Sequence, residues 1–121
     1  MPRERINPKP LYETPTLQFA DAEEAWFWFC RCQQLRDAGA RLDNGPGDTA
    51  RPCEPDDIYR TVKGLAKMRR IGGEHLRVLS RFGLRDAPPD RRCREESRAA
   101  RLWDESIDRL TTALRRKAIV A

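Results

Sequence analysis

Apolar side chains recur at helical intervals in four segments of this 121-residue chain, and no segment predicts a strand. The predicted helices span roughly residues 22–38, 55–71, 74–82 and 90–117. The pattern predicts an all-α fold, in which a single four-helix domain covers residues 19–121. An arm over residues 1–18 precedes the domain, and its four prolines predict an extended conformation.

The two middle helices form a helix-turn-helix-like pair over residues 56–84. Each helix carries an apolar stripe: Ile58, Val62, Leu65 and Met68 in the first, and Leu76, Leu79 and Phe82 in the second. Gly72 and Gly73 predict the turn between them. Gly83 followed by Leu84 predicts a glycine C-cap with its hydrophobic contact at the end of the second helix.

The first helix begins with a predicted capping box, in which Asp21 accepts from the first turn and Glu24 reaches back. Its aromatic run, residues 26–29, wraps most of the way round the helix, so two of its faces must be covered. We interpret these side chains as core, with a ligand pocket as the alternative. Residues 39–54 follow as a loop rich in turn-forming residues, either flexible or functional.

The last helix is predicted over residues 90–117. Its first three turns hold five arginines and almost nothing apolar, so this part is expected to project from the core or to face a charged partner. The tail, residues 118–121, is apolar and is predicted to pack onto the domain.

Charge divides the chain into two halves. Residues 1–57 carry 7 basic and 11 acidic side chains, whereas residues 58–121 carry 17 basic and 8 acidic ones. Such asymmetry suggests either a polyanionic partner for the basic half or neutralisation by the acidic half of the same chain. Phosphate binding needs several cations on one surface. The candidates are Lys67, Arg69, Arg70, Arg77, Arg81, Arg85, Arg91, Arg92, Arg94 and Arg98.

No catalytic motif is found, so the chain is not predicted to be an enzyme and no cofactor is expected. The four cysteines lack the short C-x2-C spacing of a structural zinc site. A metal site built from Cys32, Cys53, Cys93 and His75 remains an alternative to buried, unreactive thiols. No apolar run approaches the length that crosses a bilayer, and the first ten residues do not resemble a secretory signal. A cytoplasmic protein with reduced cysteines is therefore expected.

The segment HLRVLSRFGL, residues 75–84, resembles the helix before the turn in sigma-factor region 4 and in phage antiterminator-type regulators. The matching positions are Arg77, Val78, Leu79, Phe82, Gly83 and Leu84, and the upstream segment GLAKMRRI is similarly placed. The resemblance covers about 25 residues and implies a small bacterial or phage transcription regulator whose base readers lie within residues 91–101. After Leu84 this chain departs from the family, because Pro88 and Pro89 stand where a further short helix would follow.

The sequence thus predicts a small cytoplasmic DNA-binding regulator, or an RNA-binding one, that contacts phosphates through its basic half. The alternative is a protein-interaction module, either a homodimer or a subunit that meets an acidic partner. In that alternative the aromatic run and the last helix would form the interface.

Overall fold

The computed structural model describes residues 16–39 and 50–121, and within them the chain is all-α. The helices are α1 (Ala22–Asp37), α2 (Pro55–Lys67), α3 (Gly73–Arg85) and α4 (Ser97–Arg116), and a short 3₁₀ helix, η1 (Arg94–Glu96), precedes α4. The predicted four-helix fold is confirmed. Most of the proline-rich arm and the centre of the 39–54 loop lie outside the described residues.

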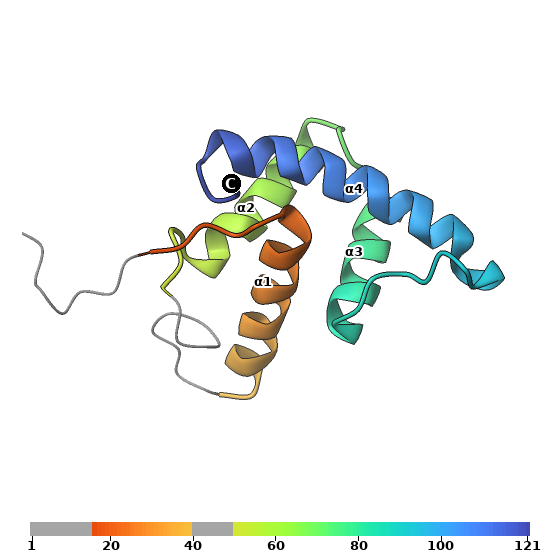
Figure 1. The fold of residues 1–121 in the computed structure, drawn as a ribbon, viewed down its shortest axis with the longest axis horizontal. Coiled ribbons are helices and arrows are strands. Elements are labelled where there is room, and N and C mark those ends of the chain that lie inside the picture. Colours follow the sequence, from red (N-terminus) through yellow and green to blue (C-terminus); the bar gives the residue numbers. More distant parts are fainter. Residues whose placement is uncertain (1–15, 40–49) are drawn as a thin grey trace, which may run out of the picture.

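Helix α4, like α1, contacts each of the other three helices. In Figure 1 it runs across the top of the view, over α1, α2 and α3. Its inner face buries Trp103, Leu110 and Leu114. Helix α1 packs on α2 and α3 from the other side, so the core lies between α1 and α4.

The aromatic run of α1 belongs to the core, as predicted. Trp26, Trp28 and Phe29 are buried, and Phe27 stacks on Trp103 with ring centroids 5.5 Å apart. The Phe19 ring covers Trp28 at 5.2 Å. The side chains of the aromatic run therefore serve mainly as core.

Local hydrogen bonds define the helix starts. The Asp21 carboxylate accepts from the Glu24 amide at 2.8 Å, and the Glu24 carboxylate accepts from the Ala20 amide at 2.8 Å, so the predicted box forms with its return bond one residue earlier. Pro55 occupies the first position of α2, and the Asp57 carboxylate accepts from the Glu54 amide at 2.8 Å. These side chains satisfy amides that have no partner within the helix.

The C-terminal tail packs onto the domain, as predicted. Ile119 and Val120 are buried, and Phe19 exchanges backbone hydrogen bonds with the tail. The Phe19 amide donates to the Ile119 carbonyl at 3.0 Å, and the Ala121 amide donates to the Phe19 carbonyl at 3.0 Å. The tail thereby fixes the segment that leads into α1.

The predicted turn between α2 and α3 is present, but α2 ends four residues before the predicted residue 71. Helix α2 ends at Lys67, and Arg69 adopts a left-handed conformation with φ 60°. The Arg70 amide then donates to the Leu65 carbonyl at 2.8 Å, which closes a Schellman motif. The helices α2 and α3 pack chiefly on α1 and α4 rather than on each other. Met68, assigned to the inner stripe, is 64% exposed because it follows the end of α2.

Gly83 does not cap α3, which corrects the sequence interpretation. The helix continues to Arg85 and ends at Asp86, whose φ is 59°, and Leu84 is 64% exposed. Gly83 instead marks the point where α1 crosses α3. A Cβ at this position would lie 2.5 Å from Cys30 Sγ and 2.8 Å from Trp26 Nε1, so only glycine allows this approach.

The last helix begins at Ser97, not at residue 90 as predicted. Two carboxylates capture the backbone amides of the preceding segment: Asp90 accepts from the Arg92 amide at 2.9 Å, and Glu96 accepts from the Asp90 amide at 2.7 Å. Such local bonds compete with helix formation. Residues 90–93 therefore form a turn that leads into η1.

Replacing Gly83 with alanine is expected to destabilise the protein by about 1–3 kcal/mol, because the added methyl group overpacks the α1–α3 crossing. Gly64, inside α2, has no atom within 4 Å of its potential Cβ. Gly64→Ala is therefore expected to stabilise by about 0.5–1 kcal/mol, since alanine favours helix. Urea unfolding of both variants measures the difference, and a neutral Gly83→Ala would contradict the close crossing.

Candidate nucleic-acid interface

Three of the ten candidate cations form ion pairs within the chain. Arg98 donates to the Glu74 carboxylate at 2.6 Å, Arg91 binds both oxygens of Asp104, and Arg85 binds both oxygens of Glu96. In each pair the arginine and the acid come from different elements of the fold. Sequence spacing did not reveal these partners, because residues 86–96 fold back along α3 and α4 rather than extending the helix.

Arg85 holds the connection between α3 and α4. Its guanidinium donates to Glu96 at 3.0 and 3.1 Å and to the Pro88 carbonyl at 2.8 Å, and it lies over the Phe82 ring at 4.4 Å. The Arg85 hydrogen bonds and the Asp90 amide lower the pKa of Glu96 from 4.5 to about 2. Arg85 is therefore a structural residue and a poor candidate for binding a ligand.

The other seven candidates are exposed and form no ion pair among the described residues: Lys67, Arg69, Arg70, Arg77, Arg81, Arg92 and Arg94. They lie in three groups, at the end of α2 and its turn, on α3, and in the connection before α4. Arg77 and Arg81 are one helical turn apart and point to the same side. Arg81 also lies over the Phe82 ring at 4.8 Å.

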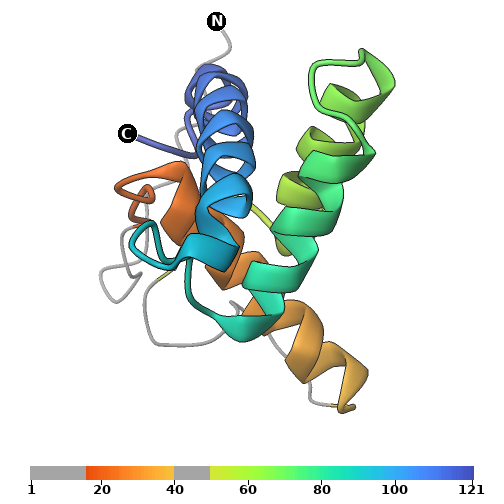
Figure 2. The ribbon, with the colours of Figure 1, turned by 90° about the vertical axis from the view of Figure 1, so that its right-hand side faces the viewer.

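The backbone segments that carry two of these groups lie on one side of the molecule. Figure 2 shows α3 and the connection that leads into α4 on the side facing the viewer. The Arg98–Glu74 pair joins the first turn of α4 to the first turn of α3, next to Arg77. The α2 end and its turn precede α3, whose 13 residues span about 20 Å at 1.5 Å per residue. The seven exposed cations of α3 and of the segments on either side of it in sequence are called the arginine row.

The acidic half does not neutralise this row within the described residues. Asp56 pairs with Arg36, and Glu24 lies 3.8 Å from Arg51, so both acids bind cations of their own half. The exception is Asp57, which reaches Arg60 at 3.4 Å near the start of α2. Neutralisation by the acidic half was one of the two alternatives suggested by the charge asymmetry. The contacts among the described residues do not show it.

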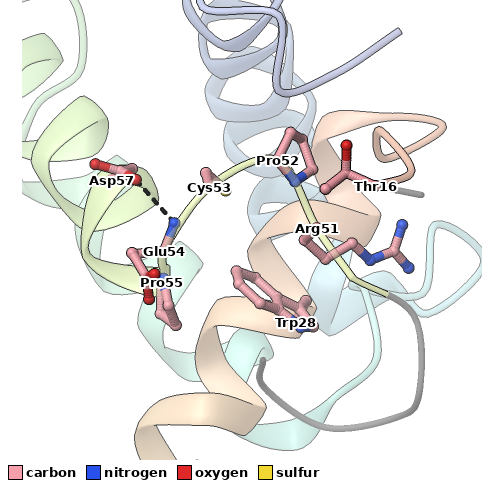
Figure 3. Close-up of a pocket in the computed structure, with 8 residues that line it drawn as sticks. All are labelled: Thr16, Trp28, Arg51, Pro52, Cys53, Glu54, Pro55 and Asp57. Atoms are coloured by element: carbon pink, nitrogen blue, oxygen red, sulfur yellow. Dashed lines mark hydrogen bonds between the residues drawn. The ribbon is translucent and has the colours of Figure 1, made fainter. Parts of the chain in front are cut away.

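A separate pocket of about 580 Å³ lies between α1 and the segment before α2 (Figure 3). Its lining includes Trp28, Arg51 and Cys53. Arg51 is already engaged, because its guanidinium lies over the Phe19 ring at 4.3 Å and donates to backbone carbonyls at 3.3 and 3.4 Å. Burial raises the pKa of Cys53 to about 11, so the thiol is protonated at neutral pH and is a poor nucleophile.

The alternative metal site from Cys32, Cys53, Cys93 and His75 is not assembled. No group of three or more histidine, cysteine or acidic side chains able to hold a metal ion occurs within residues 16–39 and 50–121. Burial raises the pKa of Cys32 to about 11, and the Cys93 thiol donates to Glu95 at 3.2 Å. His75 Nδ1 accepts from the Gly72 amide at 3.0 Å, so Nε2 carries the proton and donates to Glu105 at 2.9 Å.

Comparison with protein-family models, with curated proteins and with solved structures finds no match for this chain. In the part of the chain that the structure describes, no helix is long and apolar enough to cross a membrane. The function is therefore inferred from the side chains and their arrangement in the fold.

Replacing Glu96 with glutamine is expected to lower the stability at pH 7, because Arg85 and the Asp90 amide lose a charged acceptor. The pKa of Glu96 is depressed in the folded state, so its contribution is fully present above pH 4.5 and is lost as the pH falls towards 2. The difference in thermal midpoint between wild type and Glu96→Gln should therefore shrink over this range. The control is Asp108→Asn, because Asp108 is an exposed acid of α4 with no ion pair among the described residues. A difference in thermal midpoint between wild type and Glu96→Gln that stays constant with pH would contradict the role assigned to the Glu96 carboxylate.

Proposed function

We propose that this chain is a small nucleic-acid-binding regulatory protein that holds duplex DNA through phosphate contacts. The observation that carries the proposal is the exposed pair Arg77 and Arg81 on α3, which has no ion pair among the described residues. Arginine suits this task because its planar guanidinium binds phosphate with two donors and stays charged.

The flanking groups extend the proposed contact at both ends of α3. Arg69 and Arg70 lie at its start, and Arg92 and Arg94 lie in the connection that follows its end. The Arg85–Glu96 pair fixes that connection, which would present Arg92 and Arg94 with little conformational freedom. Several cations on a rigid frame are what backbone binding requires.

The resemblance to sigma-factor region 4 supports the same class of function but needs a different assignment of roles. It placed the base readers within residues 91–101, where the chain forms a turn, η1 and only the first residues of α4. We therefore assign phosphate contacts to α3 and its flanks and assign no base reader. The proposal includes no catalytic step.

Arg77→Ala combined with Arg81→Ala is expected to weaken binding to short duplex DNA of any sequence by roughly tenfold or more, since each charge-assisted contact is worth on the order of 1 kcal/mol. Loss of two phosphate contacts should also reduce the slope of log affinity against log salt by about 1.8. Fluorescence anisotropy over a salt series measures both quantities.

The matched control is Arg36→Ala with Arg60→Ala, which removes the same charge from residues that are ion-paired on α1 and α2. This variant should bind within about twofold of wild type, a difference of roughly 0.4 kcal/mol. If both variants lost affinity equally, the loss would follow from the change in net charge and not from contacts made by Arg77 and Arg81. Absence of duplex binding at low salt would refute the proposal.

A further inference from the structure

An apolar groove of about 420 Å³ lies between α1, α2 and α3, beside the arginine row. The aromatic side chains Trp26, Phe29 and Tyr59 contribute to its lining, together with Leu79 and Leu84. The groove exists because α2 and α3 pack on α1 and α4 and leave space between themselves. It does not include the free arginines of the proposed phosphate contact.

All three helices face the groove along a helical stripe. The lining positions are 26, 29, 30, 33, 34 and 37 on α1, 59, 62, 63 and 66 on α2, and 76, 79, 80 and 84 on α3. These spacings are those of one face of an α-helix. The α1 stripe covers 11 residue steps, or about 16 Å at 1.5 Å per residue, which is the length of three helical turns. The α1 wall of the groove is therefore as long as a three-turn helix.

Large apolar side chains at the edge of the groove remain in contact with solvent. Tyr59 is 47% exposed and Leu84 is 64% exposed, although the Tyr59 ring stacks on the buried Phe29 at 5.9 Å. Covering them would remove apolar surface from water, which is favourable at about 25 cal/mol per Å². The groove therefore offers an apolar floor and apolar edges to the same ligand.

The charges around the groove are mostly positive. Lys63 lines it, and Lys67 and Arg77 are exposed on the neighbouring sides of α2 and α3, without an ion pair among the described residues. Asp37 is the acidic side chain in the lining, and its carboxylate already accepts from Gln33 at 3.0 Å. A ligand with an apolar face and negative flanks would therefore meet complementary charge on both sides.

We infer that this groove is the docking site for an acidic amphipathic helix of a protein partner. The apolar stripe of the partner helix would lie on Trp26, Phe29 and Leu79, and its carboxylates would face Lys63 and Arg77. Helix-in-groove recognition of this kind uses apolar anchors at i, i+3 or i+4, and i+7, a spacing that the α1 stripe accommodates. The inference differs from the proposed nucleic-acid binding because its apolar contacts come from the groove, and Arg77 is the residue that the two proposals share.

The test uses two synthetic helical peptides of about 16 residues, the length that corresponds to the groove with a turn to spare. Both carry the same leucine stripe at i, i+4, i+7 and i+11. One has glutamate on its flanks and the other has lysine. Titration of each into the ¹⁵N-labelled full chain, followed by NMR, should give saturable amide shifts on the groove faces of α1, α2 and α3 with the glutamate peptide, and at least tenfold weaker binding of the lysine peptide.

Three variants locate the contact. Leu84→Glu should weaken binding of the glutamate peptide at least tenfold, whereas Met68→Glu, equally exposed but outside the groove, should leave it within twofold. Lys63→Glu should shift the preference towards the lysine peptide. Leu84→Gln, which adds no charge next to Arg81, should also weaken peptide binding but retain most of any duplex DNA binding, so the failure of one proposal can be told from the failure of the other.

Three outcomes would overturn the inference. The first is the absence of saturable shifts with either peptide. The second is equal binding of the two peptides, which would remove the case for an acidic partner. The third is a concentration-dependent dimer in sedimentation that Leu84→Glu dissociates, because the occupant would then be a second copy of the chain.

Discussion

The structure depends on the close crossing of α1 over α3 at Gly83. The absence of a side chain there lets Trp26 approach the α3 backbone, and its indole N–H donates to the Leu79 carbonyl at 2.9 Å. A buried indole donor needs such a partner, so the crossing satisfies the polar atom of a large core side chain. The same contact brings α1 and α3 together at one point and leaves the neighbouring space between α2 and α3 open as the groove.

Features set by local chemistry could be predicted from the sequence. The capping box at Asp21, the aromatic core of α1 and the packed C-terminal tail each depend on residues close together in the chain or on plain hydrophobicity. Gly83 was misassigned because a glycine followed by leucine after a helical stripe also describes a C-cap. Its real constraint comes from Trp26 and Cys30, more than fifty residues earlier, and no local pattern contains that information.

The candidate interface, too, could be predicted only in part from the sequence. The sequence revealed the surplus of cations but could not show which arginines have partners in the fold. Arg85, Arg91 and Arg98 find Glu96, Asp104 and Glu74 only because residues 86–96 turn back across α3 and α4. That path follows from Asp90 and Glu96 capturing backbone amides, a choice between competing hydrogen bonds that helical periodicity does not register.

Helix α3 is held at three places, which explains how it can serve two surfaces. His75 satisfies the Gly72 amide and binds Glu105 at its start, Gly83 fixes its crossing with α1, and Arg85 ties its end to Glu96. One side of the fixed helix forms a wall of the groove, and the next carries Arg77 and Arg81. Because Arg77 stands between the two surfaces, a phosphate and the carboxylate of a docked helix would compete for one guanidinium, so the two proposed ligands are expected to weaken each other's binding.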